Sequence, residues 1–156
     1  MSNAVHFEAG PIEQWARWQF THPKIGRPMP GKLMLGEPLG LSGMEVSLNT
    51  LPPGAAMPFA HRHRAHEELY LFLSGQGELW VDDERFQVGP GSCVRVAPAG
   101  ARVWRNTGDE PLSYVVIQAH AEPPAPVRGI ADGEVCPVPP EWPVHSPRTA
   151  RPEESA

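Results

Sequence analysis

Proline and glycine interrupt this chain so often that long helices are excluded from nearly all of it. The 156 residues include 20 prolines and 15 glycines. Proline breaks a helix because it lacks a backbone N–H and its ring clashes with the preceding turn, and both residues favour turns. We therefore expect a fold of short strands joined by turns.

Short segments between these turns predict an all-β domain. Asp82-Asp83 indicates a tight hairpin turn, and Gly89-Pro90-Gly91 turns the chain into the following strand. The expected strands cover residues 32–35, 44–51, 60–64, 68–74, 77–81, 84–88, 92–97, 101–106 and 112–120. Many short strands at close spacing are typical of a β-sandwich or a small β-barrel.

Changes in composition divide the chain into three parts. Residues 30–121 contain the expected strands and form the predicted β-domain. Residues 1–29 form an N-terminal extension, in which residues 11–20 predict a short helix opened by proline. Residues 122–156 contain nine prolines and predict an extended Pro-rich tail, with Trp142 as its anchor if the tail wraps the domain.

Charge and cysteine content limit the classes of partner. A net charge of -5 gives no electrostatic reason to expect nucleic acid or an anionic membrane surface, so the expected partner is a small molecule. Two distant cysteines offer no disulfide framework and suit a reducing cytoplasm. No export signal is seen, and the apolar stretch 69–73 is too short to span a bilayer. We expect a cytoplasmic protein.

Two alternate histidines and a carboxylate predict a metal site. Successive side chains of a strand point to opposite faces, so His61 and His63 project from the same face. The polar break at residues 64–67 allows a bend into the next strand, where Glu68 can join the two imidazoles. This ligand set suits Fe(II), and also zinc, manganese and nickel sites with open positions. The expected cofactor is one divalent ion: Fe, Mn, Ni or Zn.

The same segment resembles the first conserved motif of the cupin superfamily, G-x5-H-x-H-x3,4-E-x6-G. His61, His63, Glu68 and Gly75 have the expected relative spacing, and six residues separate Gly54 from His61 where the motif has five. The resemblance, to small single-domain cupins of the conserved-barrel, cupin 2-like type, implies a jelly-roll β-barrel over residues 30–121. It also implies that the two histidines and Glu68 are metal ligands.

The second cupin motif, G-x5-P-x-G-x2-H-x3-N, resembles residues 91–106 but lacks its histidine. Counted forward from Gly100 the histidine position falls on Val103, and counted back from Asn106 it falls on Arg102. If Arg102 points into the barrel, its guanidinium would repel a cation, pair with Glu68 and leave an anion-binding pocket without metal. The sequence leaves both pockets open.

Further residues are candidates for the pocket lining. Met57, Tyr70, Phe72 and Arg102 are expected to contact substrate, and Tyr70 and Arg102 are also the catalytic candidates. His120 ends the last expected strand, and it could replace the missing histidine if that strand runs beside the site.

Three classes of function follow. The leading expectation is a metal-dependent enzyme, dioxygenase-like or isomerase/lyase-like, that acts on a small oxygenated molecule. The second is a non-catalytic cupin that binds or senses a carboxylate, metal-free with Arg102 in its pocket. It is less favoured because no DNA-binding helix-turn-helix pattern accompanies the barrel. The third is a metal-free scaffold with solvated histidines. Whether the protein is an enzyme stays open.

An apolar row predicts self-association. Leu69, Leu71 and Leu73 alternate on the strand face opposite Glu68. An apolar row on the outer face of a barrel sheet needs a cover, either the N-terminal segment or a second subunit. We expect a homodimer, as is common among cupins.

Overall fold

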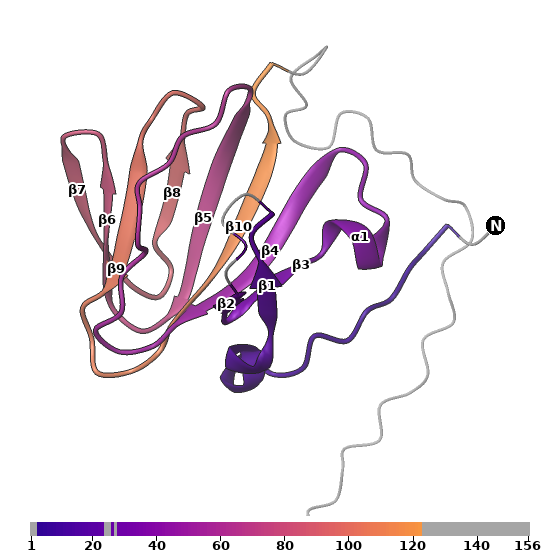
Figure 1. The fold of residues 1–156 in the computed structure, drawn as a ribbon, viewed down its shortest axis with the longest axis horizontal. Coiled ribbons are helices and arrows are strands. Elements are labelled where there is room, and N and C mark those ends of the chain that lie inside the picture. The colour runs from indigo at the N-terminus through magenta and orange to yellow at the C-terminus, as the bar shows by residue number, and fades with distance from the viewer. Residues whose placement is uncertain (1–2, 24–25, 27, 123–156) are drawn as a thin grey trace, which may run out of the picture. The chain divides into compact units, whose positions relative to one another are not determined.

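The computed structural model describes residues 3–23, 26 and 28–122, which form an all-β fold of antiparallel sheets (Figure 1). The expected tail from residue 123 onward, with Trp142, lies outside the described residues. The elements are η1 (Ile12–Arg17), β1 (Gln19–Thr21), β2 (Pro28–Pro30), β3 (Lys32–Met34), α1 (Gly36–Leu39), β4 (Met44–Leu51), β5 (His66–Ser74), β6 (Gly77–Val81), β7 (Glu84–Val88), β8 (Cys93–Val96), β9 (Arg102–Asn106) and β10 (Leu112–His120).

Two larger sheets form the barrel, and β1 and β2 form a separate two-stranded sheet. One has five strands in the order β3-β4-β10-β5-β8, and the other has three in the order β7-β6-β9 (Figure 1). The chain before β5 runs along the free edge of β9, where Met57 N donates to Trp104 O at 2.9 Å and His61 N donates to Arg102 O at 3.0 Å. The predicted all-β jelly roll is confirmed. The hairpin at Asp82 is confirmed as well, because Val81 pairs with Glu84 across it.

The expected strand at residues 60–64 is wrong. In its place there is an isolated bridge between His61 and Arg102, and His63 N donates to Pro98 O at 3.0 Å. The partner strand β9 begins at Arg102, so the residues after His61 have no strand opposite them with which to form a regular ladder. The segment is nevertheless paired at every second residue, which keeps both histidines on one side.

Alternation in β5 and β9 decides which side chains enter the core. Arg102, Trp104 and Asn106 of β9 are buried, whereas Val103 is only partly buried and Arg105 is exposed. Because side chains alternate along a strand, the burial of Trp104 carries Arg102 inward and turns Val103 outward. The core consists of Tyr70, Phe72, Leu79, Val88, Val96, Trp104, Leu112, Tyr114 and Val116.

The N-terminal segment packs against the five-stranded sheet. The short helix expected after Pro11 is present as the 3-10 helix η1, which contacts β4 and buries Trp15. It leads into the hairpin of β1 and β2. Neither helix in the described part of the chain is long and apolar enough to cross a membrane.

The outer face of β5 carries the apolar row noted in the sequence. Leu69 and Leu71 are partly buried, and Leu73 is 45 % exposed, whereas Glu68, Tyr70 and Phe72 face the core. The alternation is therefore as expected. The homodimer itself stays a prediction.

Candidate metal centre

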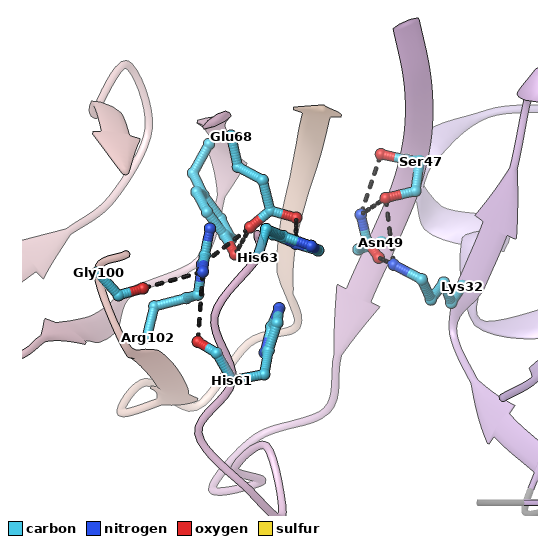
Figure 2. A network of polar contacts seen from close by, with 9 residues as sticks. Lys32, Ser47, Asn49, His61, His63, Glu68, Gly100 and Arg102 are labelled. Atoms are coloured by element: carbon cyan, nitrogen blue, oxygen red, sulfur yellow. Dashed lines mark hydrogen bonds and ion pairs between the residues drawn. The ribbon is translucent and has the colours of Figure 1, made fainter. Parts of the chain in front are cut away.

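Three potential ligands converge at one end of the β5 inner face. One donor atom from each of His61, His63 and Glu68 can be chosen so that all three lie within 4.8 Å of one another. The two imidazole centroids are 5.4 Å apart, and His63 Nε2 is 3.0 Å from Glu68 Oε1. Figure 2 shows the three side chains gathered on one side of the close-up. The structure thus brings together the residues that the sequence selected.

The donor set fits a divalent transition metal. Two ligands bound at right angles, each about 2.1 Å from one ion, lie about 3 Å apart, as His63 Nε2 and Glu68 Oε1 do. Burial lowers the pKa of His61 to about 4, so its ring is neutral at pH 7, the form that binds metals. His61 Nδ1 is buried and has no hydrogen-bond partner among the described residues, so no hydrogen bond to these residues occupies this nitrogen.

Three side chains hold Glu68 in place. Its Oε2 accepts a hydrogen bond from the Tyr70 hydroxyl at 2.6 Å and lies 3.1 Å from Arg102 Nε, while Oε1 faces His63. Burial by itself raises the pKa of Glu68, but the Tyr70 hydrogen bond and the positive charge of Arg102 outweigh it, and the pKa falls below its ordinary value. Glu68 is therefore a carboxylate at neutral pH.

Arg102 supports this carboxylate from outside the cavity. The side chain is fully buried, and its Nη1 donates to Gly100 O at 2.9 Å and to His61 O at 3.3 Å. Arg102 does not line the cavity beside the metal residues, whereas Glu68 and Tyr70 do. Its guanidinium is thus directed at Glu68 and the backbone, and in Figure 2 it lies on the far side of Glu68 from Lys32.

A cavity of about 610 Å³ adjoins the three candidate ligands. Of the residues expected to contact substrate, Met57 and Tyr70 line it, and Phe72 belongs to the core without lining it. His120 pairs with His66 across β5 and β10, with ring centroids 5.6 Å apart, and it is outside the candidate ligand group.

Sequence reasoning missed a second polar group in this cavity. Lys32 lines it, and Lys32 Nζ donates to Asn49 Oδ1 at 3.0 Å and to Ser47 Oγ at 3.2 Å. One signal was available: Ser47 and Asn49 are polar residues two apart in a strand, so they share a face. Residues 20–34 also supply cavity lining, in particular Phe20 and Met29. No local pattern indicates that an N-terminal extension closes a barrel.

Comparison with known proteins is consistent with this architecture. The model of the cupin domain family matches residues 47–118. A cupin protein from Bacteroides fragilis is 30 % identical, with a TM-score of 0.70, and the match covers 87 % of this chain and 99 % of that one. A sugar phosphate isomerase from Silicibacter pomeroyi is 28 % identical, with a TM-score of 0.52, over 58 % of this chain and 60 % of that one.

A curated relative is an uncharacterized protein from Methanocaldococcus jannaschii, 31 % identical over 74 residues. The match covers 47 % of this chain and 59 % of the relative, so the chain spans well under two thirds of its length. The Bacteroides protein, in contrast, is matched along nearly its whole length and shares the double-sheet fold. On this ground, and on the match of the cupin domain model, the chain belongs to the cupin superfamily, conserved-barrel type.

Proposed function

We propose that the protein binds one divalent transition metal through His61, His63 and Glu68 and is a metal-dependent enzyme for a small oxygenated molecule. The observation that carries the proposal is the convergence of these three donors beside a cavity of about 610 Å³. Three protein ligands leave positions open at an ion, which is the arrangement of catalytic rather than structural sites. Such an ion would act as a Lewis acid or hold a bidentate oxygen ligand.

The protein's own residues would orient the ligands and the substrate. Tyr70 and Arg102 hold Glu68 Oε2, which leaves Oε1 directed toward His63 and the cavity. Burial and the neighbouring Glu68 charge raise the pKa of Tyr70 far above its ordinary value. The phenol therefore keeps its proton at neutral pH and acts as a hydrogen-bond donor rather than as a base. Met57 and Trp104 contribute apolar lining to the cavity.

The reaction class is proposed at a coarser level. Within the cupin superfamily, the protein from Silicibacter pomeroyi is a sugar phosphate isomerase. At 28 % identity over 58 % of this chain, that likeness supports an isomerase or lyase reaction over a dioxygenase reaction. Both reactions use an open metal position beside an oxygenated substrate.

Metal content tests the proposal directly. Untagged protein would be stripped with a chelator, given Fe(II), Mn(II), Ni(II) or Zn(II) separately, desalted and analysed for metal per chain. We expect about one equivalent of at least one metal in the wild type. In His61→Ala and His63→Ala we expect less than a tenth of that, because two remaining ligands hold a transition metal poorly against solvent.

His66→Ala is the matched control, since His66 is close to His63, with ring centroids 6.3 Å apart, yet is outside the ligand group. It should retain the metal. If the wild type binds none of the four metals, or if His61→Ala and His63→Ala bind as well as the wild type, the proposal is wrong. The protein would then be better described as a metal-free cupin that binds a small anion.

A further inference from the structure

Lys32 brings a positive charge into the cavity from the side of β3 and β4. It begins β3, whose register places it opposite Asn49 of β4. In Figure 2 Lys32, Ser47 and Asn49 form one cluster, and the candidate metal ligands form another across from it. Lys32 and Asn49 line the same cavity as His61, His63 and Glu68. The cavity therefore borders both clusters.

Neutral groups hold the Lys32 ammonium in place. Asn49 Nδ2 donates to Ser47 O and Ser47 Oγ, both at 3.0 Å, which turns Asn49 Oδ1 toward the ammonium. Ser47 Oγ supplies the second acceptor. An ammonium has three N–H donors, and these two contacts use two of them. No hydrogen bond within the described part of the chain uses the third, although the Phe20 ring centroid lies 6.0 Å from Lys32 Nζ.

No described carboxylate forms an ion pair with Lys32. Burial lowers the pKa of Lys32, and the charges of Glu68 and Glu45 only partly oppose this effect. Both carboxylates are committed elsewhere: Glu68 to Tyr70 and Arg102, and Glu45 Oε1 to the backbone N–H of Gly36 at 2.7 Å. A partly buried cation whose protein partners are all neutral gains most from an added anion.

The backbone conformation of Gly31 fixes the position of Lys32. Gly31 has φ +74, and a side chain there would place its Cβ 2.2 Å from Thr50 O. Gly31 N donates to Trp18 O at 2.7 Å, and Thr50 N donates to Gly31 O at 2.7 Å. Only glycine accepts this conformation and this close approach without strain. The entry into β3 is thereby fixed, and Lys32 with it.

We propose that Lys32, held by Ser47 and Asn49, binds an acidic oxygen group of the substrate, a carboxylate or a phosphate, in the cavity opposite His61, His63 and Glu68. The inference deepens the proposed function by naming the substrate class, a small organic anion. That the other end of the substrate binds a metal ion rests on the proposed function. Anion binding at Lys32 requires no metal.

Binding of simple anions can be followed by ¹H–¹⁵N NMR on the full chain, with and without Zn(II). Malonate and inorganic phosphate would be titrated at constant ionic strength, with glycerol as the uncharged probe. We expect saturable shifts of the Asn49 side-chain amide and of the Leu33 backbone amide with at least one anion, and none with glycerol. The anion that binds more tightly identifies the acidic group.

Two variants separate the role of Lys32 from general charge effects. Lys32→Met should weaken anion binding about tenfold or more, the typical effect of losing a charge-assisted hydrogen bond, while metal per chain stays unchanged. Lys32→Arg should retain part of the affinity. Arg62→Gln removes the same charge from an exposed residue that also lines the cavity, and it should bind the anion nearly as well as the wild type.

Anion shifts that persist in Lys32→Met, an equal loss in Arg62→Gln, or no saturable shift with either anion would each overturn the inference. The metal-free titration separates it from the proposed function. Loss of metal binding with intact anion binding would contradict the metal site alone, and the reverse would contradict only the role of Lys32.

Discussion

Two charged side chains face the same cavity and are held in opposite ways. Glu68 has polar partners on both carboxylate oxygens, with the Tyr70 hydroxyl and the Arg102 guanidinium at one and His63 at the other. Lys32 is held by two neutral acceptors, Asn49 and Ser47, and has no ion pair in the described part of the chain. One end of the cavity has its charge neutralised by the protein, and the other does not.

The difference suits two different roles: Glu68 must keep one orientation, whereas Lys32 can bind an anion from outside the protein. A carboxylate that takes part in a metal site has to keep one orientation, and the guanidinium behind it enforces that orientation. A cation without a counter-charge in the protein gains more interaction free energy from a bound anion than a cation that is already paired. Mutations at the two ends of the cavity should therefore change the free energy of unfolding by different amounts. Three measurements can compare them.

The largest expected effect comes from Arg102→Met. The substitution leaves Glu68 buried without its cationic partner, and breaking such a buried pair costs about 3–5 kcal/mol of unfolding free energy. Lys32→Met at the other end leaves only neutral groups behind, so its cost should be well below that of Arg102→Met. Urea unfolding of the metal-free proteins would measure both.

Arg95→Gln is the control for this comparison. Arg95 pairs at 2.7 Å with Glu67, the neighbour of Glu68 on the opposite face of β5, and both side chains are substantially exposed. An exposed pair contributes about 0–1 kcal/mol. Equal losses in Arg102→Met and Lys32→Met would contradict the distinction between the two ends.

The second effect is a dependence of stability on pH at the His61 end. Burial sets the pKa of folded His61 near 4, below the ordinary 6.5, so between these values the unfolded chain binds a proton that the folded protein does not. Stability should fall as the pH drops from 6.5 towards 4, by about 3 kcal/mol at most from this residue. His61→Gln should flatten this part of the curve in metal-free protein. An unchanged slope would contradict the assignment.

The smallest expected effect comes from Tyr70→Phe. Loss of the 2.6 Å hydrogen bond to Glu68 should cost about 1.5–3 kcal/mol and raise the pKa of Glu68. Glu68 stabilises the fold above the unfolded pKa of a carboxyl group, and this contribution is lost as the pH falls through its lowered folded pKa. The acid unfolding midpoint should therefore move to higher pH in Tyr70→Phe.

Tyr114→Phe serves as the comparison, because the Tyr114 hydroxyl accepts a hydrogen bond from Trp104 Nε1 at 2.7 Å, whereas the hydroxyl that donates to Glu68 is that of Tyr70. It should lower stability by about 1 kcal/mol without moving the acid midpoint. Equal midpoint shifts in the two variants would show that the Tyr70 hydroxyl has no particular effect on Glu68.

Much of the architecture could be predicted because its signals are local. Proline and glycine spacing indicates the turns, and alternation indicates the strands, so eight of the nine expected strands are present with small changes at their ends. The exception, residues 60–64, failed because a strand needs a neighbour along its whole length, and the partner β9 begins at Arg102. Local sequence carries little information about which segments pair and over what length.

The sequence by itself determined the cupin motif and therefore the candidate ligands, because His61, His63 and Glu68 are close along the chain and alternate residues of an extended segment share a side. Only the tertiary structure decided that Arg102 lies behind Glu68, since this depends on the register of β9 in the barrel. It also decided that Lys32 shares the cavity. Lys32 is 15 positions from Ser47 and 17 from Asn49 in the sequence. Only the pairing of β3 with β4 and the position of the N-terminal segment beside the cavity bring this cluster to the site.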